Sequence, residues 1–295
     1  MKDTFTTYHP IVNLIYFCAV ISFGMVFLHP VFLFIALSGS FAYAFFLNGK
    51  RTFKFTLFFI IPMMIVAGIV NPLFNHRGVT TLRYIGDNPL TLESIIYGIA
   101  IAIMFGVVIL WFSCVNIVMT SDKLMYLFGR LVPSLSMIFS MTLRFVPKFK
   151  HQIKLISDSQ RCIGQDISEG TLKERARHGI KILSIMVSWA LENAIDTADS
   201  MRSRGFGLRG RSSFAIYRFD GRDRNALLGI ILMSLLVIVG GFLGENNIQY
   251  FPYIKVKPIS ITSIIAYTSY ALLCFTPVII NISEAIKWQR LQSKI

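Results

Sequence analysis

Charged residues are scarce in this sequence, and acidic ones especially so. Of its 295 residues, 15% are charged and 54% are hydrophobic, and Lys and Arg outnumber Asp and Glu by 29 to 15. An ordinary soluble domain has about 25% charged residues, so a soluble domain of this length would have too little polar surface to cover its core. The proportions indicate a polytopic membrane protein. They exclude a disordered chain, a disulfide scaffold and a coiled coil.

The motifs of common catalytic and metal sites are also missing. The sequence contains no phosphate-binding loop, no zinc-protease motif and no nucleophile elbow. Its four cysteines lack the spacing of a disulfide framework or a zinc site, and its five histidines are scattered. We therefore expect no catalytic residue, no metal site and no cofactor bound by this chain.

Six apolar stretches are long enough to cross a bilayer, which takes about 20 residues for each helix. They predict transmembrane helices at Ile11–His29, Pro30–Leu47, Phe55–Val70, Ile95–Met119, Ala226–Leu243 and Ile261–Ile282. The third is short, the first two meet in a tight turn, and Pro62 and Pro277 are expected to kink their helices. None of the six contains Asp, Glu, Lys or Arg, whereas carriers driven by ions usually need such residues near the midplane.

The basic residues gather on one side of this topology. The stretch 120–225 holds 18 Lys and Arg with 10 Asp and Glu. Together with the two termini and the loop after the second span, which lie on the same side, it accounts for 25 of the 29 basic residues. Because Lys and Arg collect in cytoplasmic loops, we expect both termini and 120–225 in the cytoplasm. The predicted domains are 1–119 with four transmembrane helices, a cytoplasmic domain at 120–225, and 226–295 with two transmembrane helices and a tail.

The cytoplasmic stretch has the pattern of long amphipathic helices. One is predicted at about 134–164 with an apolar stripe that includes Phe145 and Phe149, a second at about 179–205, and a short basic helix at about 170–177 between them. One face of the second helix carries small and apolar residues: Ala190, Ala194, Ala198 and Met201. Alanines at every fourth residue either form an ordinary core face or let two helices cross closely. The sharper prediction is a crossing against 134–164.

The two long helices end alike in sequence. One ends Arg161-Cys162-Ile163-Gly164 and the other Arg204-Gly205-Phe206-Gly207, so each reads arginine, small, apolar, glycine. Ordinary capping is one explanation, because Gly commonly follows a helix end and Arg suits the helix dipole there. The other explanation is a pair of exposed arginines offered to a symmetric or pseudo-symmetric partner, since Arg suits acidic and backbone acceptors at interfaces.

These segments resemble a known family, the transmembrane T component of energy-coupling factor transporters, which are modular ABC importers. The likeness extends over nearly the whole chain and is carried by the segments 8–10, 71–74, 143–147, 159–164 and 198–207. It implies an all-α polytopic membrane protein with about six transmembrane helices and two crossed cytoplasmic coupling helices. It also implies a bacterial or archaeal cell membrane as the location.

The resemblance further implies partners and the residues that meet them. In that family each coupling helix ends in a short motif centred on an arginine, which docks in a groove of one of two ABC ATPases that bind ATP and Mg²⁺. The corresponding docking residues here are Gln160, Arg161 and Cys162 in the first helix and Ser203, Arg204 and Gly205 in the second. Both triplets lack the family's usual Ala at the first position, and Cys162 replaces Ser or Gly.

A third kind of partner is implied as well, a small membrane S component that captures a vitamin or a metal ion. It is expected against the coupling helices, at Ala190, Ala194, Ala198, Met201, Phe145 and Phe149. The family's mechanism would let ATP binding change the angle between the crossed helices and topple the S component. The transported substrate is then a property of the S component and not of this sequence.

Other classes of function fit the sequence less well. A stand-alone permease or channel is the main alternative, and the absence of charge inside the spans counts against it. An enzyme embedded in the membrane would need a nucleophile paired with a base, or a metal cluster. A membrane anchor for nucleic acid would need a basic surface with few acids, whereas 120–225 has 10 acids among its 28 charges. We expect no nucleic-acid partner.

Overall fold

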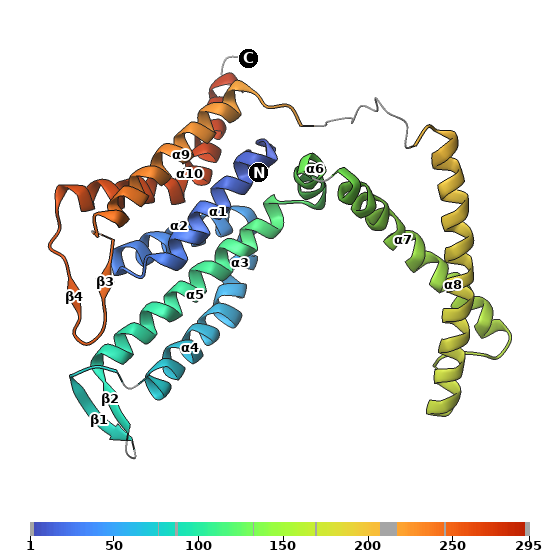
Figure 1. Ribbon diagram of the computed structural model, residues 1–295, viewed down its shortest axis with the longest axis horizontal. Helices are drawn as coiled ribbons and strands as arrows, with labels where there is room; N and C mark the ends of the chain where they lie inside the picture. The colour runs from blue at the N-terminus through green and yellow to red at the C-terminus, as the bar shows by residue number, and fades with distance from the viewer. Residues whose placement is uncertain are drawn as a thin grey trace. The chain divides into compact units, whose positions relative to one another are not determined.

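The chain folds almost entirely into helices. The computed structural model describes residues 3–75, 77–85, 88–131, 133–168, 170–206, 217–244 and 246–292 (Figure 1). They form two compact units, one made of Met1–Leu124 with Tyr217–Ile295 and the other of Met125–Ile216. The first unit contains the apolar helices, and the second contains the two long amphipathic helices.

The first unit is a bundle of apolar helices that supports the expected all-α membrane fold. Its helices are η1 (Phe5–Thr7), α1 (Pro10–Val26), α2 (Pro30–Asn48), α3 (Lys50–Phe55), the π-helical turn η2 (Thr56–Ile60), α4 (Ile61–Phe74), α5 (Leu92–Val118), α9 (Gly221–Phe242) and α10 (Ile261–Gln292). Five are long and apolar enough to cross a membrane: α2, the continuous helix Lys50–Phe74, α5, α9 and α10. The apolar α1 is shorter, at 17 residues.

Two short antiparallel hairpins complete this unit. Strands β1 (Thr81–Ile85) and β2 (Asn88–Thr91) join α4 to α5, and β3 (Ile248–Gln249) and β4 (Lys255–Val256) join α9 to α10. Both hairpins lie at the end of the helices away from the N-terminus (Figure 1). The helix α6 (Ser121–Leu131) follows α5 and leads from the first unit into the second.

The third span is longer than the sequence indicated. The basic segment 49–54, which separates the predicted spans Pro30–Leu47 and Phe55–Val70, was expected to be a loop. It instead contains most of α3, so the helix begins at Lys50 and runs to Phe74. Gly49, with a φ of 55°, makes the sharp turn that lets α3 follow α2 directly. Pro62 lies in the first turn of α4, directly after η2, and the wider π turn accommodates a residue that has no N–H to donate.

The helices of the bundle approach closely at small residues. A Cβ atom built on Gly39 of α2 would lie 2.8 Å from the Cβ of Cys274 in α10, and one on Gly240 of α9 would lie 2.8 Å from the Cβ of Ala266 in α10. Apolar side chains gain little by leaving lipid for a helix interface, so close backbone approach and van der Waals packing hold such helices together. These two glycines therefore set how closely α10 packs on its neighbours.

A buried lysine ties the N-terminal segment to the junction of α5 and α6. Lys123 is 3% exposed, and its Nζ donates to the carbonyl oxygens of Thr6 at 2.6 Å and Val118 at 2.9 Å. With the oxygen and nitrogen of its side-chain amide assigned so that both are hydrogen-bonded, Asn13 accepts from Lys123 Nζ at 2.9 Å through Oδ1. Its Nδ2 donates to the Phe5 carbonyl at 3.2 Å. All three protons of the ammonium group therefore have acceptors.

The charge that balances this ammonium belongs to Asp3. Its carboxylate accepts hydrogen bonds from the hydroxyl of Tyr43 in α2, at 2.9 Å, and from the side-chain amide of Asn281 in α10. The Asn281 carbonyl oxygen in turn accepts from the backbone N–H of Thr4 at 2.7 Å. Asp3 and Lys123 thus connect η1, α1, α2, α5, α6 and α10 at one end of the bundle.

Replacing Lys123 with Met should destabilise the protein strongly. The change leaves three buried acceptors without a donor and Asp3 without its counter-charge, and removing one partner of a buried pair costs about 3 kcal/mol or more. The measurement is the thermal unfolding midpoint in detergent, followed by tryptophan fluorescence. Lys287→Met is the matched control, because Lys287 forms an exposed pair with Glu284 at 3.3 Å and such pairs contribute about 0–1 kcal/mol. Equal midpoints for the two variants would contradict the prediction.

The stability of the protein should also rise with pH above about 8 because of Lys123. Burial lowers the pKa of this amine from 10.5 to about 8, against the opposing effect of the Asp3 charge. Between these two pKa values the unfolded chain holds more protons on this side chain than the folded chain, so the free energy of unfolding increases with pH. Unfolding in denaturant from pH 8 to 10 measures the slope. The prediction fails if Lys123→Met shows the same pH dependence as the wild type.

Candidate functional site

The second unit is built on two long helices with clear start signals. Helix α7 (Pro133–Cys162) begins with a proline at its first position, where no N–H is needed. Helix α8 (Leu172–Ser203) begins with a capping box, in which Thr171 Oγ1 accepts from the Glu174 backbone at 3.4 Å and Glu174 Oε2 accepts from the Thr171 backbone at 2.9 Å. Hydrogen bonds from Thr171 hold the pKa of the Glu174 carboxyl below its usual value.

The prediction of a separate short helix at 170–177 is wrong, because α8 is one helix of 32 residues. Gly179 lies inside it and does not end it. A single glycine in a helix interior costs only about 1 kcal/mol relative to alanine, and the capping box and the packing further along outweigh that cost.

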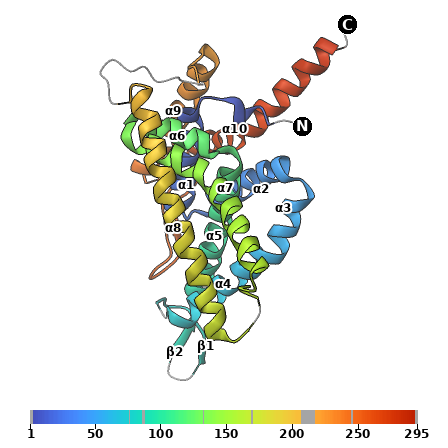
Figure 2. The ribbon, with the colours of Figure 1, turned by 90° about the vertical axis from the view of Figure 1, so that its right-hand side faces the viewer.

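The two helices cross and pack through a small apolar cluster (Figure 1 and Figure 2). Its buried members are Ile156 of α7 with Ile182 and Met186 of α8, and Phe149 and Trp189 pack against them. The rings of Phe149 and Trp189 meet edge to face at 5.6 Å. Large side chains therefore hold the helices together at one point.

The crossing is not made by the alanines to which the sequence assigned it. Ala190 is half-buried, and Ala194 and Ala198 are exposed. The side chains that meet α7 include Trp189 and Asn193, each one residue before an alanine, which is about 100° around the helix. The alanines thus flank the contact face. Of the other residues assigned to this region, Phe145 is half-buried and stacks on Phe149 at 5.9 Å.

Both helices end in the same backbone structure. At the end of α7 the N–H of Gln165 donates to the carbonyl of Gln160 at 2.9 Å, and the N–H of Gly164 donates to the carbonyl of Arg161 at 3.0 Å. At the end of α8 the same two bonds run from Phe206 to Met201 at 3.0 Å and from Gly205 to Arg202 at 2.9 Å. Gly164 and Gly205 have φ values of 74° and 77°. Each end is a Schellman motif with glycine in the left-handed position.

These hydrogen bonds correct the register in which the two ends were compared. The comparison of the two sequence ends paired Arg161 with Arg204. The shared cap instead pairs Arg161 with Arg202, Cys162 with Ser203, Ile163 with Arg204, and Gly164 with Gly205. In this register the segments 158–164 and 199–205 both read Asp-Ser-x-Arg-x-x-Gly. This register matches more identical residues than the first comparison did, and in it Ile163 corresponds to Arg204.

The first end is internally paired. Arg161 Nε lies 3.2 Å from Asp166 Oδ2, and the backbone N–H of Ser168 donates to Asp166 Oδ1 at 3.1 Å. Hydrogen bonds from Ser168, and then the charge of Arg161, lower the pKa of the Asp166 carboxyl. Of the neighbouring predicted residues, Gln160 is half-buried and Cys162 is an exposed free thiol.

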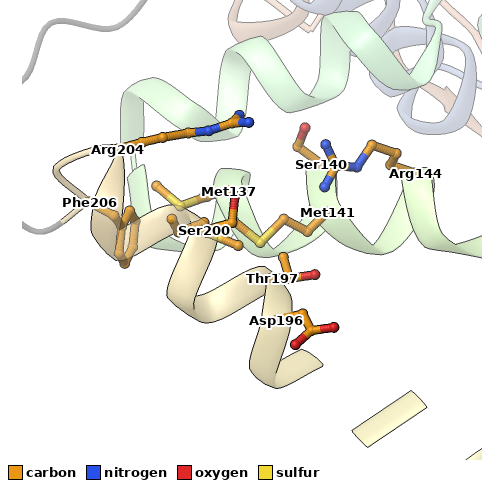
Figure 3. Close-up of a pocket in the computed structure, with 10 residues that line it drawn as sticks. Met137, Ser140, Met141, Arg144, Asp196, Thr197, Ser200, Arg204 and Phe206 are labelled. Carbon is orange, nitrogen blue, oxygen red and sulfur yellow. The ribbon is translucent and has the colours of Figure 1, made fainter. Parts of the chain in front are cut away.

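The second end borders a cavity inside the same unit. Arg204 forms no ion pair with any residue that the structure describes. Its side chain and that of Arg144 extend toward Ser140 (Figure 3). The cavity has a volume of about 500 Å³ and is lined by Met137, Ser140, Met141, Arg144, Asp196, Thr197, Ser200, Met201, Arg204 and Phe206. Predicted residue Ser203 has its hydroxyl bonded to the Ser200 carbonyl at 3.0 Å.

In the described ranges no group of three or more His, Cys, Asp and Glu side chains could hold a metal ion. Ile163, Arg202 and Asp166 were not among the predicted docking residues. The shared cap makes the first two part of the helix ends, and the ion pair with Arg161 adds Asp166. The Asp-Ser-x-Arg-x-x-Gly repeat was the signal that could have found the first two.

Comparison with known proteins places the chain in a family. Residues 5–214 match the family model CbiQ, described as cobalt transport protein. The chain belongs to the CbiQ family. Members of this family are membrane subunits of transporters and are not themselves catalytic, in agreement with the resemblance to T components.

Individual relatives of this CbiQ-family chain carry the name energy-coupling factor transporter transmembrane protein EcfT. The protein from Macrococcus caseolyticus is 28% identical over 221 residues, which cover 70% of this chain and 80% of that protein. The Bacillus subtilis protein is 24% identical over 189 residues, covering 60% and 71%. The protein from Exiguobacterium sibiricum is 32% identical over 111 residues, which cover 37% of this chain and 42% of that protein.

Alanine in place of either cap glycine should loosen the corresponding helix end. A left-handed φ costs a residue with a Cβ about 1 kcal/mol, so Gly164→Ala and Gly205→Ala should speed hydrogen exchange at the amides of Gln165 and Phe206. The control is Gly179→Ala, inside α8 with open space around the added Cβ, which should stabilise the helix by up to about 1 kcal/mol. Unchanged exchange at both caps would show that these glycines are not needed there.

Proposed function

We propose that this chain is the transmembrane coupling subunit of an energy-coupling factor type ABC importer. In this role it transmits the ATP-driven motion of two ABC ATPases to a small membrane S component, which delivers a vitamin or a metal ion. The observation that supports the proposal best is the pair of matching caps on α7 and α8, whose exposed ends offer two related docking elements. A subunit that contacts two copies of one ATPase fold would need such a pair.

The ends of the two helices are the proposed docking sites. They comprise Gln160, Arg161 and Cys162 on α7 and Ser203, Arg204 and Gly205 on α8. When the ATPases close on ATP, these ends move with the grooves that hold them. Because α7 and α8 share one small buried cluster around Ile182 and Met186, the angle between them can change without exposing a large core.

The S component is proposed to cover an apolar stripe on α8. The stripe recurs at helical spacing and faces away from α7, and its members are Ile180, Leu183, Val187, Leu191, Ala194 and Ala198. The four large residues among them are 50–69% exposed. A continuous apolar face of this kind marks an interaction surface, and a membrane protein of low polarity matches it. Tilting of α8 would then press directly on the S component.

The proposed orientation follows the basic residues. With both termini and the second unit in the cytoplasm, the hairpins β1–β2 and β3–β4 face the opposite side of a bacterial or archaeal cell membrane. Lys and Arg of α7 and α8 would add binding to anionic lipid, at about 1 kcal/mol for each residue near the surface. ATP and Mg²⁺ would be held by the partner ATPases.

Charge reversal at Arg204 should release an ATPase from the complex. The tagged chain is purified from native membranes in mild detergent, and the ATPases that accompany it are quantified by mass spectrometry. We expect Arg204→Glu to lower recovery of at least one ATPase tenfold or more, as for an interface hot spot, and to abolish ATP-driven uptake. Arg177→Glu on the same helix, also exposed, is the control and should change neither.

The result that would overturn the proposal is transport by the chain alone. If the purified wild-type chain carries no ATPase in detergent or in nanodiscs, and moves substrate by itself in vesicles, it is a stand-alone permease. Arg161 and Arg204 would then be helix-cap residues only.

A further inference from the structure

A cavity lies between α9 and α10, at the end of the bundle where Tyr8 of the N-terminal segment reaches it. The two helices lie side by side (Figure 1), and the cavity between them has a volume of about 320 Å³. Its polar end is formed by Arg222 and Asn225, in the first two turns of α9. Further along, its lining includes Gly229, Ile230 and Met233 of α9 with Ile280 of α10. The lining therefore changes from charged to apolar along α9.

The positive charge at the polar end belongs to Arg222. Its guanidinium group lies 4.4 Å from the centroid of the Tyr8 ring and donates to Thr7 Oγ1 at 3.2 Å. It forms no ion pair with any residue that the structure describes. Because a guanidinium group has five N–H donors, most of them remain available for a phosphate, which arginine binds through two parallel hydrogen bonds.

The acidic neighbours of this end are bonded elsewhere. Asp223 is 4% exposed, and its carboxylate accepts from two backbone N–H groups at 3.0 and 3.1 Å. Glu284 is paired with Lys287 at 3.3 Å. An anion that approaches Arg222 thus meets a guanidinium group that no carboxylate already holds.

The rest of the cavity is an apolar groove that lacks a side chain at its centre. A Cβ atom built on Gly229 would meet no atom within 4 Å. Thr276 of α10 lines this part too, but its hydroxyl already donates to the Leu272 carbonyl at 2.7 Å. Arg222 and Met233 are 11 positions apart, which is about 16 Å along a helix. Half of the hydrocarbon core of a bilayer is about 15 Å thick, so the groove has the length of one leaflet.

We propose that this cavity binds one anionic phospholipid, with its phosphate on Arg222 and Asn225 and an acyl chain along Gly229, Ile230 and Met233. Basic pockets between membrane helices are typical headgroup sites, and the apolar groove continues from the charge into the membrane. A helix of a partner protein fits poorly, because a helix is about 10 Å across and less than one turn of it would fill 320 Å³. The proposal depends only on the membrane location of the chain and not on its proposed partners.

Lipid titration of the full chain tests the proposal. The purified protein is stripped of lipid in detergent, and binding of dipalmitoyl phosphatidylglycerol is followed by native mass spectrometry. We expect one lipid to bind tightly to the wild type, and Arg222→Gln and Gly229→Leu each to weaken this binding at least tenfold. Arg224→Gln and Leu235→Phe are the matched controls, because both positions are exposed on α9 and lie outside the cavity lining. Their affinity should stay within twofold of the wild type.

Two further probes separate the headgroup from the chain. Dipalmitoylglycerol lacks the phosphate and glycerol phosphate lacks the chains, so each should bind at least tenfold more weakly than the whole lipid. The proposal is overturned if glycerol phosphate binds as well as the lipid, or if Arg222→Gln and Gly229→Leu bind lipid like their controls. It is also overturned if Gly229→Leu instead loses a partner protein from the complex purified from native membranes. Thermal unfolding midpoints within a few degrees of the wild type show that the variants are folded.

Discussion

The bundle depends on one buried ammonium group. Lys123 stands at the point where the apolar helices end and the amphipathic unit begins, and its acceptors belong to the N-terminal segment, α1 and the last residue of α5. A charge at this depth is tolerated because every proton is bonded and Asp3 lies nearby. The first turn of α6 is thereby fixed to the bundle.

The second unit has the opposite character. Its two helices are long, but the buried residues that join them are Ile156, Ile182 and Met186. Outside that cluster the facing surfaces carry polar side chains and a cavity of about 500 Å³. A small contact between two stiff helices resists bending of each helix while allowing their angle to change, because little apolar surface is exposed by the change. The second unit thus combines rigidity along each helix with freedom in the angle between the helices.

The sequence predicted what depends on local pattern and missed what depends on distant contacts. Of the six predicted spans, five correspond to the helices that are long and apolar enough to cross a membrane, and the first corresponds to the shorter α1. The glycines after α7 and α8 located the ends of both helices. Periodicity failed on α8, where alanines and large residues lie one position apart, because only the partner decides which of two adjacent stripes is buried. The role of Lys123 could not be found from the sequence, because only folding brings Thr6, Asn13 and the charge of Asp3 close to it. Asp3 is in turn held by Asn281, which lies 278 residues away in the sequence.

The caps of α7 and α8 have the same backbone hydrogen bonds but carry different side chains. Glycine is retained in both because the left-handed turn requires it, and the arginine two residues after Ser159 has its counterpart two residues after Ser200. The residue before the glycine is exposed at both ends and its side chain takes no part in the cap hydrogen bonds, so it can vary without altering the cap. Ile163 at one end and Arg204 at the other therefore differ in chemistry at positions that the shared cap makes equivalent in backbone.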